Sequence, residues 1–462
     1  MRPLEIDIDF FNFKEVYDMI DATAIKASLD KAINDFAAHP ENFSKNPGSD
    51  FTRDRKMPAS DVLRFLILME RDSVDMELLK YFGHDLVATP TQPAYIQQRS
   101  KLVPDTFKML LAKFNAALPA AVTYQEKYIL YGVDGSGFNI AYNPNDPDTF
   151  NPPSGKSKLG NNEIHVVASY RLTDHLFTDA VIQPGRKKNE YAAICDLIDN
   201  CSLEGGTPIF LADRGFPSYN MFAHAVEKGV KFLVRAKDLY VKRLLGNDYP
   251  AGEKEFDVTV TRIVTRSNSK KERSSPDAPE LYRYVDRNTK FDFMEPGSHG
   301  EYSVTVRVVR VKVSEGVYEN LITNLSADEF DRDALRTLYY IRWGLETAFR
   351  YLKHAVGASD FHCRSFENVS HEVWARLILF NCCSAISALA VPEKPENSKY
   401  DVYQVNYTMA IKNVHIFLRQ KETETPIGIV AVIKKYICPV RPKRRFERRH
   451  RYQTPLKFGY RH

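Results

Sequence analysis

The chain has 462 residues, of which 44% are hydrophobic and 27% are charged, and its formal net charge is +5. This length predicts two to four domains with enough apolar material for a real core. The first residues contain no basic region followed by an apolar run, and no stretch reaches the length of a membrane span, which argues against secretion and against a bilayer. The six cysteines show no framework spacing, so we expect reduced thiols in an intracellular protein.

The first 120 residues have a mostly helical pattern. An apolar helix is predicted at 61–70 and a short helix at 76–82, followed by a turn that contains Gly83 and a third helix that begins near Gln92. This order is typical of a helix-turn-helix DNA reader, although many small helical bundles share it. The third helix would present to DNA the hydrogen-bonding side chains of Gln97, Gln98, Arg99 and Lys101.

From Tyr124 onward, apolar strand patterns alternate with helical ones. A strand predicted at 128–133 ends in Asp134 and is followed by small residues, and a second buried strand at 209–212 ends in Asp213. Each aspartate could cap a turn or a helix. Two carboxylates at the ends of buried strands would also leave space and backbone for a ligand.

A β-rich stretch of nearly ninety residues follows, interrupted by a charged, serine-rich loop at about 267–280. After it, the apolar run at 319–325 is predicted to be a last core strand. The β-rich stretch therefore reads as an insertion between a strand and a helix of one discontinuous domain.

The helix predicted at 331–357 arranges four polar side chains along one line. Tyr339, Arg342, Glu346 and Lys353 fall within an arc of roughly 60°, beside an apolar arc that would dock on a core. An exposed face with i,i+4 pairs would show a similar pattern. A carboxylate in line with a phenol, a guanidinium and an ammonium also suits a site for phosphate and metal.

The basic tail of the chain is either a solvated segment or a contact for a polyanion. Interleaved aromatic residues favour nucleic acid. The arginines that we expect to contact DNA there include Arg444, Arg445, Arg448 and Arg449.

Asp134, Asp213 and Glu346 together supply the oxygen ligands that hard divalent cations prefer. A pair of Mg²⁺ or Mn²⁺ ions about 3.5–4 Å apart supports phosphoryl transfer on a phosphodiester. The sequence contains no glycine-rich phosphate loop, no G-x-S-x-G motif and no H-E-x-x-H motif that would indicate another chemistry.

The spacing from Tyr339 to Arg342, Glu346 and Lys353 resembles the Y-R-E-K signature of DDE transposases of bacterial insertion sequences. The sequences VDGSGF around Asp134 and LADRGF around Asp213 are similar to the first and second acidic motifs of that family. The resemblance implies an α/β fold with an RNase H-like mixed-sheet core that a β-rich insertion interrupts. The implied parts are a helical DNA-binding region at 1–123, core segments at 124–236 and 319–395, the insertion at 237–318 and a helical, basic region at 396–462.

The resemblance also implies a function. Asp134, Asp213 and Glu346 would bind two divalent ions, Mg²⁺ or Mn²⁺, while Tyr339, Arg342 and Lys353 would hold DNA phosphates. The reaction would be cleavage at the terminal inverted repeats and joining of the 3′-OH to target DNA, by a homodimer that pairs two ends. Such a protein would be cytoplasmic and nucleoid-associated, without a membrane partner. The alternatives are a catalytically silent transposon-derived DNA-binding protein and an RNase H-like nuclease without strand transfer.

Overall fold

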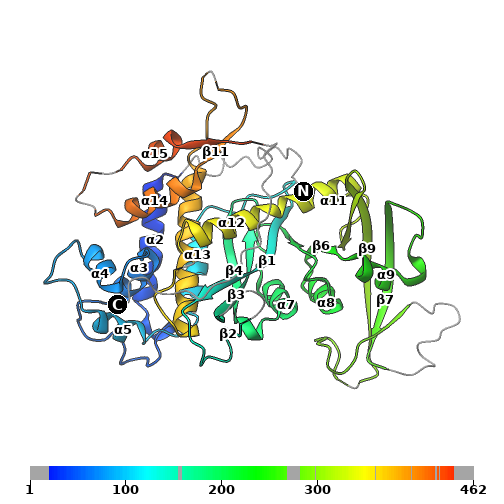
Figure 1. Ribbon diagram of the computed structural model, residues 1–462, viewed down its shortest axis with the longest axis horizontal. Coiled ribbons are helices and arrows are strands. Elements are labelled where there is room, and N and C mark those ends of the chain that lie inside the picture. The colour runs from blue at the N-terminus through cyan, green and yellow to red at the C-terminus, as the bar shows by residue number, and fades with distance from the viewer. Residues whose placement is uncertain are drawn as a thin grey trace.

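The structure, a computed structural model, describes residues 20–441 except 154–158, 268–280, 297, 359, 397, 422–423 and 426. One large mixed sheet occupies the middle of the molecule, and a bundle built from helices of both ends of the chain lies on one side of it (Figure 1). Two separate apolar cores cover the two faces of the sheet.

The central strands combine an antiparallel half with a parallel half. β1 pairs antiparallel with β3, which pairs in turn with β4 and with the short β2, whereas β5 runs parallel to β1 and β6 runs parallel to β5. The bounds are β1 Tyr128–Ile140, β2 Phe150–Asn151, β3 Asn161–Arg171, β4 Leu176–Pro184, β5 Thr207–Ala212 and β6 Lys231–Ala236. The five principal strands are therefore ordered β4-β3-β1-β5-β6.

The prediction that the first strand ends at Asp134 is wrong. β1 continues to Ile140 because β3 pairs with it along its whole second half. Only the parallel pairing with β5 stops there, since the last partners are Val133 and Ala212. Asp134 thus follows the end of the parallel ladder but lies inside a longer strand.

The strands predicted as an insertion continue the same sheet. β9 pairs with both β10 and β7, β8 pairs with β7, and β10 pairs antiparallel with β6. The bounds are β7 Phe256–Thr265, β8 Tyr282–Tyr284, β9 Glu301–Ser314 and β10 Val317–Thr323. A helix that the sequence pattern did not indicate, α9 at Asp238–Leu245, precedes them.

Alternate residues of β1 face the two cores, as the pleat of a strand requires. Tyr128 and Leu130 belong to one core together with the helices α12, Trp343–His354, and α13, Phe366–Ala388, whereas Ile129, Tyr131 and Val133 belong to the other core together with α7 and α8. The helices on the second face are α7 Glu190–Asn200 and α8 Tyr219–Lys228.

Helix α13, Phe366–Ala388, joins the helical bundle to the sheet. It packs against α2, α3 and α6 on one side and β4 on another. The predicted N-terminal helices and the glycine turn are confirmed, and Gly83 has the left-handed φ of 67° that such a turn uses. The bundle contains α2 Ala22–Ala37, η2 Pro40–Asn42, α3 Ala59–Leu68, α4 Val74–Tyr81, α5 Gln92–Arg99, α6 Thr106–Ala116, α14 Tyr407–Arg419 and α15 Ile429–Lys435.

The single helix predicted at 331–357 is wrong in one respect, because it is two helices. α11, Arg332–Ile341, and α12, Trp343–His354, meet at Arg342. There the amide of Arg342 donates to the carbonyl of Tyr339, and the amide of Leu345 donates to the carbonyl of Arg342. These i to i+3 bonds tighten the turn locally, as in a 3₁₀ segment, without removing the helical direction.

All six cysteines are free, as predicted. None of the helices in the described part of the chain combines the length and the apolar character that crossing a bilayer requires.

Candidate active site

Three segments that are distant in sequence bring the predicted acids together. Asp134 and Asp213 directly follow Val133 and Ala212, the last partners of the β1–β5 ladder, so the parallel ladder ends with the two aspartates side by side. Helix α12 delivers Glu346 because it lies directly on β1, where the absent side chain of Gly132 lets Leu345 approach. A Cβ at Gly132 would lie 3.3 Å from the Cβ of Leu345. This close approach makes a glycine the fitting residue at position 132.

Arg342 links Glu346 to Asp134. Its Nη2 donates to Glu346 Oε1 at 2.9 Å, and its Nη1 lies 3.6 Å from Asp134 Oδ2. The guanidinium is buried, and its Nε and Nη1 have no hydrogen-bond acceptor in the described part of the chain. The buried guanidinium of Arg342 therefore lies between two of the three acids, and its Nε and Nη1 make no hydrogen bond within the described residues.

Asp213 is held by Tyr339, which was predicted as a contact for DNA phosphate, and by Arg235, which was not predicted as a site residue. The Tyr339 hydroxyl donates to Asp213 Oδ1 at 3.2 Å, and Arg235 forms an ion pair with the same oxygen at 2.7 Å. Arg235 also pairs with Glu319, across the neighbouring strands β6 and β10. The sequence carries one signal for Arg235 that was not used, namely a charged residue inside the apolar strand KFLVRA.

The electrostatics of the two aspartates differ. Burial raises the pKa of Asp134 to about 6, with further contributions from the negative charges of Glu346 and Asp213, although Arg342 opposes the rise. Burial would also raise the pKa of Asp213, but the amide of Arg214 and the guanidinium groups of Arg235 and Arg342 outweigh it and lower the pKa. Mutual influence of this kind requires the carboxylates to lie near one another.

Lys353 occupies the far end of the polar line. Its Nζ donates to the carbonyl of Gly137 at 2.7 Å and lies 4.6 Å from the centre of the Phe138 ring. Burial lowers the pKa of Lys353, although the charges of Glu163 and Asp134 oppose this. The ammonium is thus placed beside the second half of β1, next to the acids.

The donor set suits a hard divalent cation, but the side chains are not arranged around one. Asp134, Asp213 and Glu346 offer carboxylate oxygens and remain partly exposed, with 26%, 30% and 24% of the side chains accessible. Within the described residues, no group of three or more His, Cys, Asp or Glu side chains is placed to share a metal ion. Ion binding would require the carboxylates to exchange their contacts with Arg342 and Arg235 for the metal.

The expectation that Arg99 contacts DNA is wrong. Its side chain is only 3% exposed and forms an ion pair at 3.2 Å with Glu372 of α13, which is 2% exposed. Its Nη2 also donates to the carbonyl of Asn368. Arg99 thus faces α13 rather than solvent.

The other residues of the predicted reading helix remain accessible. Gln97 is exposed, and Gln98 is half-buried and accepts a hydrogen bond from Lys101 at 2.9 Å. The predicted contacts of Arg444, Arg445, Arg448 and Arg449 lie outside the described residues.

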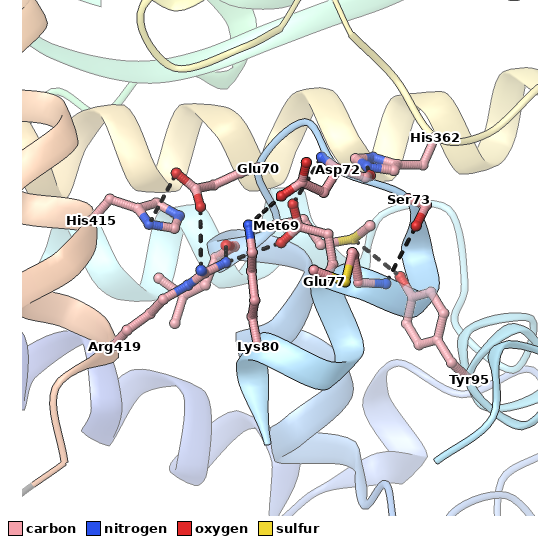
Figure 2. Close-up of polar contacts among 12 residues, drawn as sticks. Met69, Glu70, Asp72, Ser73, Glu77, Lys80, Tyr95, His362, His415 and Arg419 are labelled. Atoms are coloured by element: carbon pink, nitrogen blue, oxygen red, sulfur yellow. Dashed lines mark hydrogen bonds and ion pairs between the residues drawn. The ribbon is translucent and has the colours of Figure 1, made fainter. Parts of the chain in front are cut away.

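Charge pairs join the N-terminal helices to the C-terminal ones around α4 (Figure 2). Arg419 of α14 pairs with the fully buried Glu77 at 3.1 Å and with Glu70 at 3.2 Å. The imidazole Nε2 of His362 also forms a hydrogen bond with the carbonyl of Asp72 at 2.8 Å. The predicted DNA-binding region is therefore anchored to the end of the chain.

Comparisons with known proteins place the chain in a family. A search of curated proteins found no significant match. Among solved structures, the cryo-EM structure of the piggyBac transposase synaptic complex with hairpin DNA overlaps 90% of this chain and 82% of that chain, with a TM-score of 0.42 and 9% identity. The family described as Transposase DDE domain matches residues 128–382, which is more than half of the chain and includes Asp134, Asp213 and Glu346. The chain therefore belongs to the family of transposases with a DDE domain.

Proposed function

We propose that this transposase cleaves DNA at the terminal inverted repeats of a bacterial insertion sequence and joins the freed 3′-OH to target DNA. The observation that carries the proposal is the meeting of Asp134, Asp213 and Glu346 from β1, the end of β5 and α12. Burial and the charges of Glu346 and Asp213 raise the pKa of Asp134, and carboxylates with raised pKa values cluster at functional sites.

Asp134, Asp213 and Glu346 would hold two divalent ions, Mg²⁺ or Mn²⁺. When bound, such ions supply activation of the attacking oxygen and stabilisation of the leaving oxygen of a phosphodiester. The protein contributes the backbone positions of the three acids, which the end of the β1–β5 ladder and the close packing of α12 on Gly132 determine.

Arg342, Tyr339 and Lys353 would hold DNA phosphates. Arg342 already has two nitrogens without an acceptor in the described part of the chain, and a planar guanidinium can bind a phosphate through two parallel bonds. Tyr339 orients Asp213 through its hydroxyl. Lys353 supplies a compact positive charge beside β1.

We further assign the core to the RNase H-like class. Support comes from the strand order β4-β3-β1-β5-β6, with the first three strands antiparallel and the last three parallel. Both aspartates stand at the edge where the parallel ladder ends, which is where open α/β sheets bind ligands.

A homodimer is the proposed active form. An insertion sequence has two ends, and the described residues of one chain provide one set of Asp134, Asp213 and Glu346. The exposed Gln97 and the basic tail are the proposed DNA contacts outside the site. The protein would act in the cytoplasm, at the nucleoid.

A DNA cleavage assay tests the proposal. Purified full-length protein is incubated with a labelled DNA fragment that carries the inverted repeat found beside its gene, a target plasmid and Mg²⁺ or Mn²⁺. We expect nicking at the repeat end and a joined product, both of which Glu346→Gln abolishes and the exposed control Glu204→Gln retains.

The same assay separates the alternatives. Binding of the repeat without any cleavage would refute the enzyme and support a silent DNA-binding protein. Cleavage without a joined product would support a nuclease that lacks strand transfer.

A further inference from the structure

A histidine and a glutamate lie directly against the two acidic motifs, and the proposed mechanism does not use them. His165 stands on β3 opposite Gly137 of β1, and its side chain is buried. Its Nε2 bonds Oε1 of Glu190 at 2.9 Å. Glu190 is the first residue of α7, where the positive end of the helix favours a carboxylate.

The carboxylate of Glu190 faces the backbone of both acidic motifs. A Cβ on Gly135 would lie 2.6 Å from His165 Nε2 and would overlap Glu190 Oε1. A Cβ on Gly215 would lie 3.2 Å from Glu190 Oε2. The two oxygens of one carboxylate therefore rest against the glycines that come one residue after Asp134 and two residues after Asp213.

The pair has a stable charge arrangement. The hydrogen bond from His165 lowers the pKa of Glu190, and the negative charge of Asp213 opposes this effect. Glu190 therefore remains ionised at neutral pH. The influence of Asp213 also shows that Glu190 lies within electrostatic reach of the site.

The location of the pair argues that it serves the site. The side chain of His165 is 5% exposed and that of Glu190 is 33% exposed, so the pair reaches from the interior toward the surface. Their contacts lie at the positions where Asp134 and Asp213 leave the parallel ladder. Because pairing with β3 holds Gly135 in the sheet, the contact of Glu190 with Gly215 would fix the loop after Asp213 relative to β1.

We propose that Glu190, oriented by His165, is a positioning residue that sets the separation of Asp134 and Asp213 by contact with Gly135 and Gly215. This inference rests on the proposed function, because the separation matters only if the two aspartates share divalent ions. Removal of a residue that orients metal ligands typically lowers metal affinity by about 10–100-fold.

Metal binding by the full chain provides the readout. Mn²⁺ is titrated into the DNA-free protein and followed by electron paramagnetic resonance, and nicking is measured against Mn²⁺ and DNA concentration. For Glu190→Ala we expect about tenfold or greater loss of Mn²⁺ affinity, with an unchanged KM for DNA. Glu190→Gln keeps the shape and the hydrogen bond, so it should restore most of the affinity, and the exposed control Glu204→Gln should match the wild type.

A second variant keeps the test valid if Glu190→Ala does not fold. Gly135→Ala keeps both His165 and Glu190 in the protein, but the added methyl group pushes their side chains away from β1. This variant should therefore lose Mn²⁺ affinity in the same way as Glu190→Ala. Wild-type affinity in Glu190→Ala or Gly135→Ala would overturn the proposal. Equal losses in Glu190→Gln and Glu190→Ala would also overturn it, because the charge rather than the contact would then be responsible.

The outcome separates this inference from the proposed function. If the wild-type protein neither binds Mn²⁺ nor nicks DNA, the proposed function itself fails. If the wild type does both and the Glu190 variants behave like it, only the positioning role is refuted.

Discussion

Replacing Asp134 with asparagine should make the metal-free protein more stable. Burial and the neighbouring charges of Glu346 and Asp213 raise the pKa of Asp134 from its ordinary 3.8 to about 6. Ionising this carboxyl therefore costs the folded state more than the unfolded state. The folded protein loses stability as the pH rises from about 4 to about 6, and the loss is complete above that range.

The size of the effect follows from the pKa difference. A difference of about two pH units corresponds to roughly 3 kcal/mol, and the side chain of Asp134 is only 26% exposed, so solvent screens it little. Asparagine keeps the shape but loses a charge partner of Arg342, which offsets part of the gain. At neutral pH we expect Asp134→Asn to raise the free energy of unfolding by about 1–3 kcal/mol.

Thermal unfolding in metal-free buffer measures this gain. The melting temperature of Asp134→Asn should exceed that of the wild type by a few degrees at about pH 7.5, and the difference should shrink toward about pH 4.5. Asp328→Asn, at an exposed aspartate, should show no such pH-dependent gain.

Added Mg²⁺ or Mn²⁺ should make the wild type more stable than Asp134→Asn. A ligand that binds only the folded state at about 100 times its Kd stabilises it by about 2.7 kcal/mol, and the wild type should gain this while Asp134→Asn gains little. The reasoning would be refuted if Asp134→Asn were less stable than the wild type at neutral pH, or if the difference did not change with pH.

Four further substitutions test other parts of the structure. Arg99→Met leaves the buried carboxylate of Glu372 unpaired, so the free energy of unfolding should fall by about 3–5 kcal/mol in thermal or denaturant unfolding. Gln97→Ala, at an exposed position, should leave stability unchanged and weaken DNA binding in a gel-shift assay. Gly132→Val should lower the free energy of unfolding by about 1–3 kcal/mol and lower the nicking rate, because the added side chain pushes α12, which carries Glu346, away from β1. An unchanged nicking rate would contradict this packing. Lys353→Met should reduce the slope of log K for DNA against log salt by about one, as measured by fluorescence anisotropy, and an unaltered slope would exclude a phosphate contact.

Local patterns were sufficient for most of the strands and helices. The apolar runs predicted the core strands β1, β5 and β10, since a strand buried on both faces is apolar on both. They failed at the second half of β1, where Gly135, Ser136 and Gly137 read as a turn. Antiparallel pairing with β3 holds these residues in the sheet despite their low strand propensity.

The acids of the site were also readable, because their spacing in each segment is a local property. Tyr339, Arg342, Glu346 and Lys353 lie in line at helical spacing, and the structure places them against β1 and Asp213. Their partner Arg235 was missed, because only the neighbouring strands β5 and β6 bring it to Asp213.

The amino-acid sequence by itself determined most of the elements and the identity of the three acids, because both depend on residue types at short spacing. Tertiary structure decided which side chains of each helix or strand are buried and which other segments they contact. Arg99 has the spacing of a DNA contact, yet packing against α13 buries it with Glu372, because a charge removed from water must lie beside its opposite. In the same way, only the fold shows that Glu190 and His165 rest against the glycines beside Asp134 and Asp213, since these residues come from different strands, loops and helices.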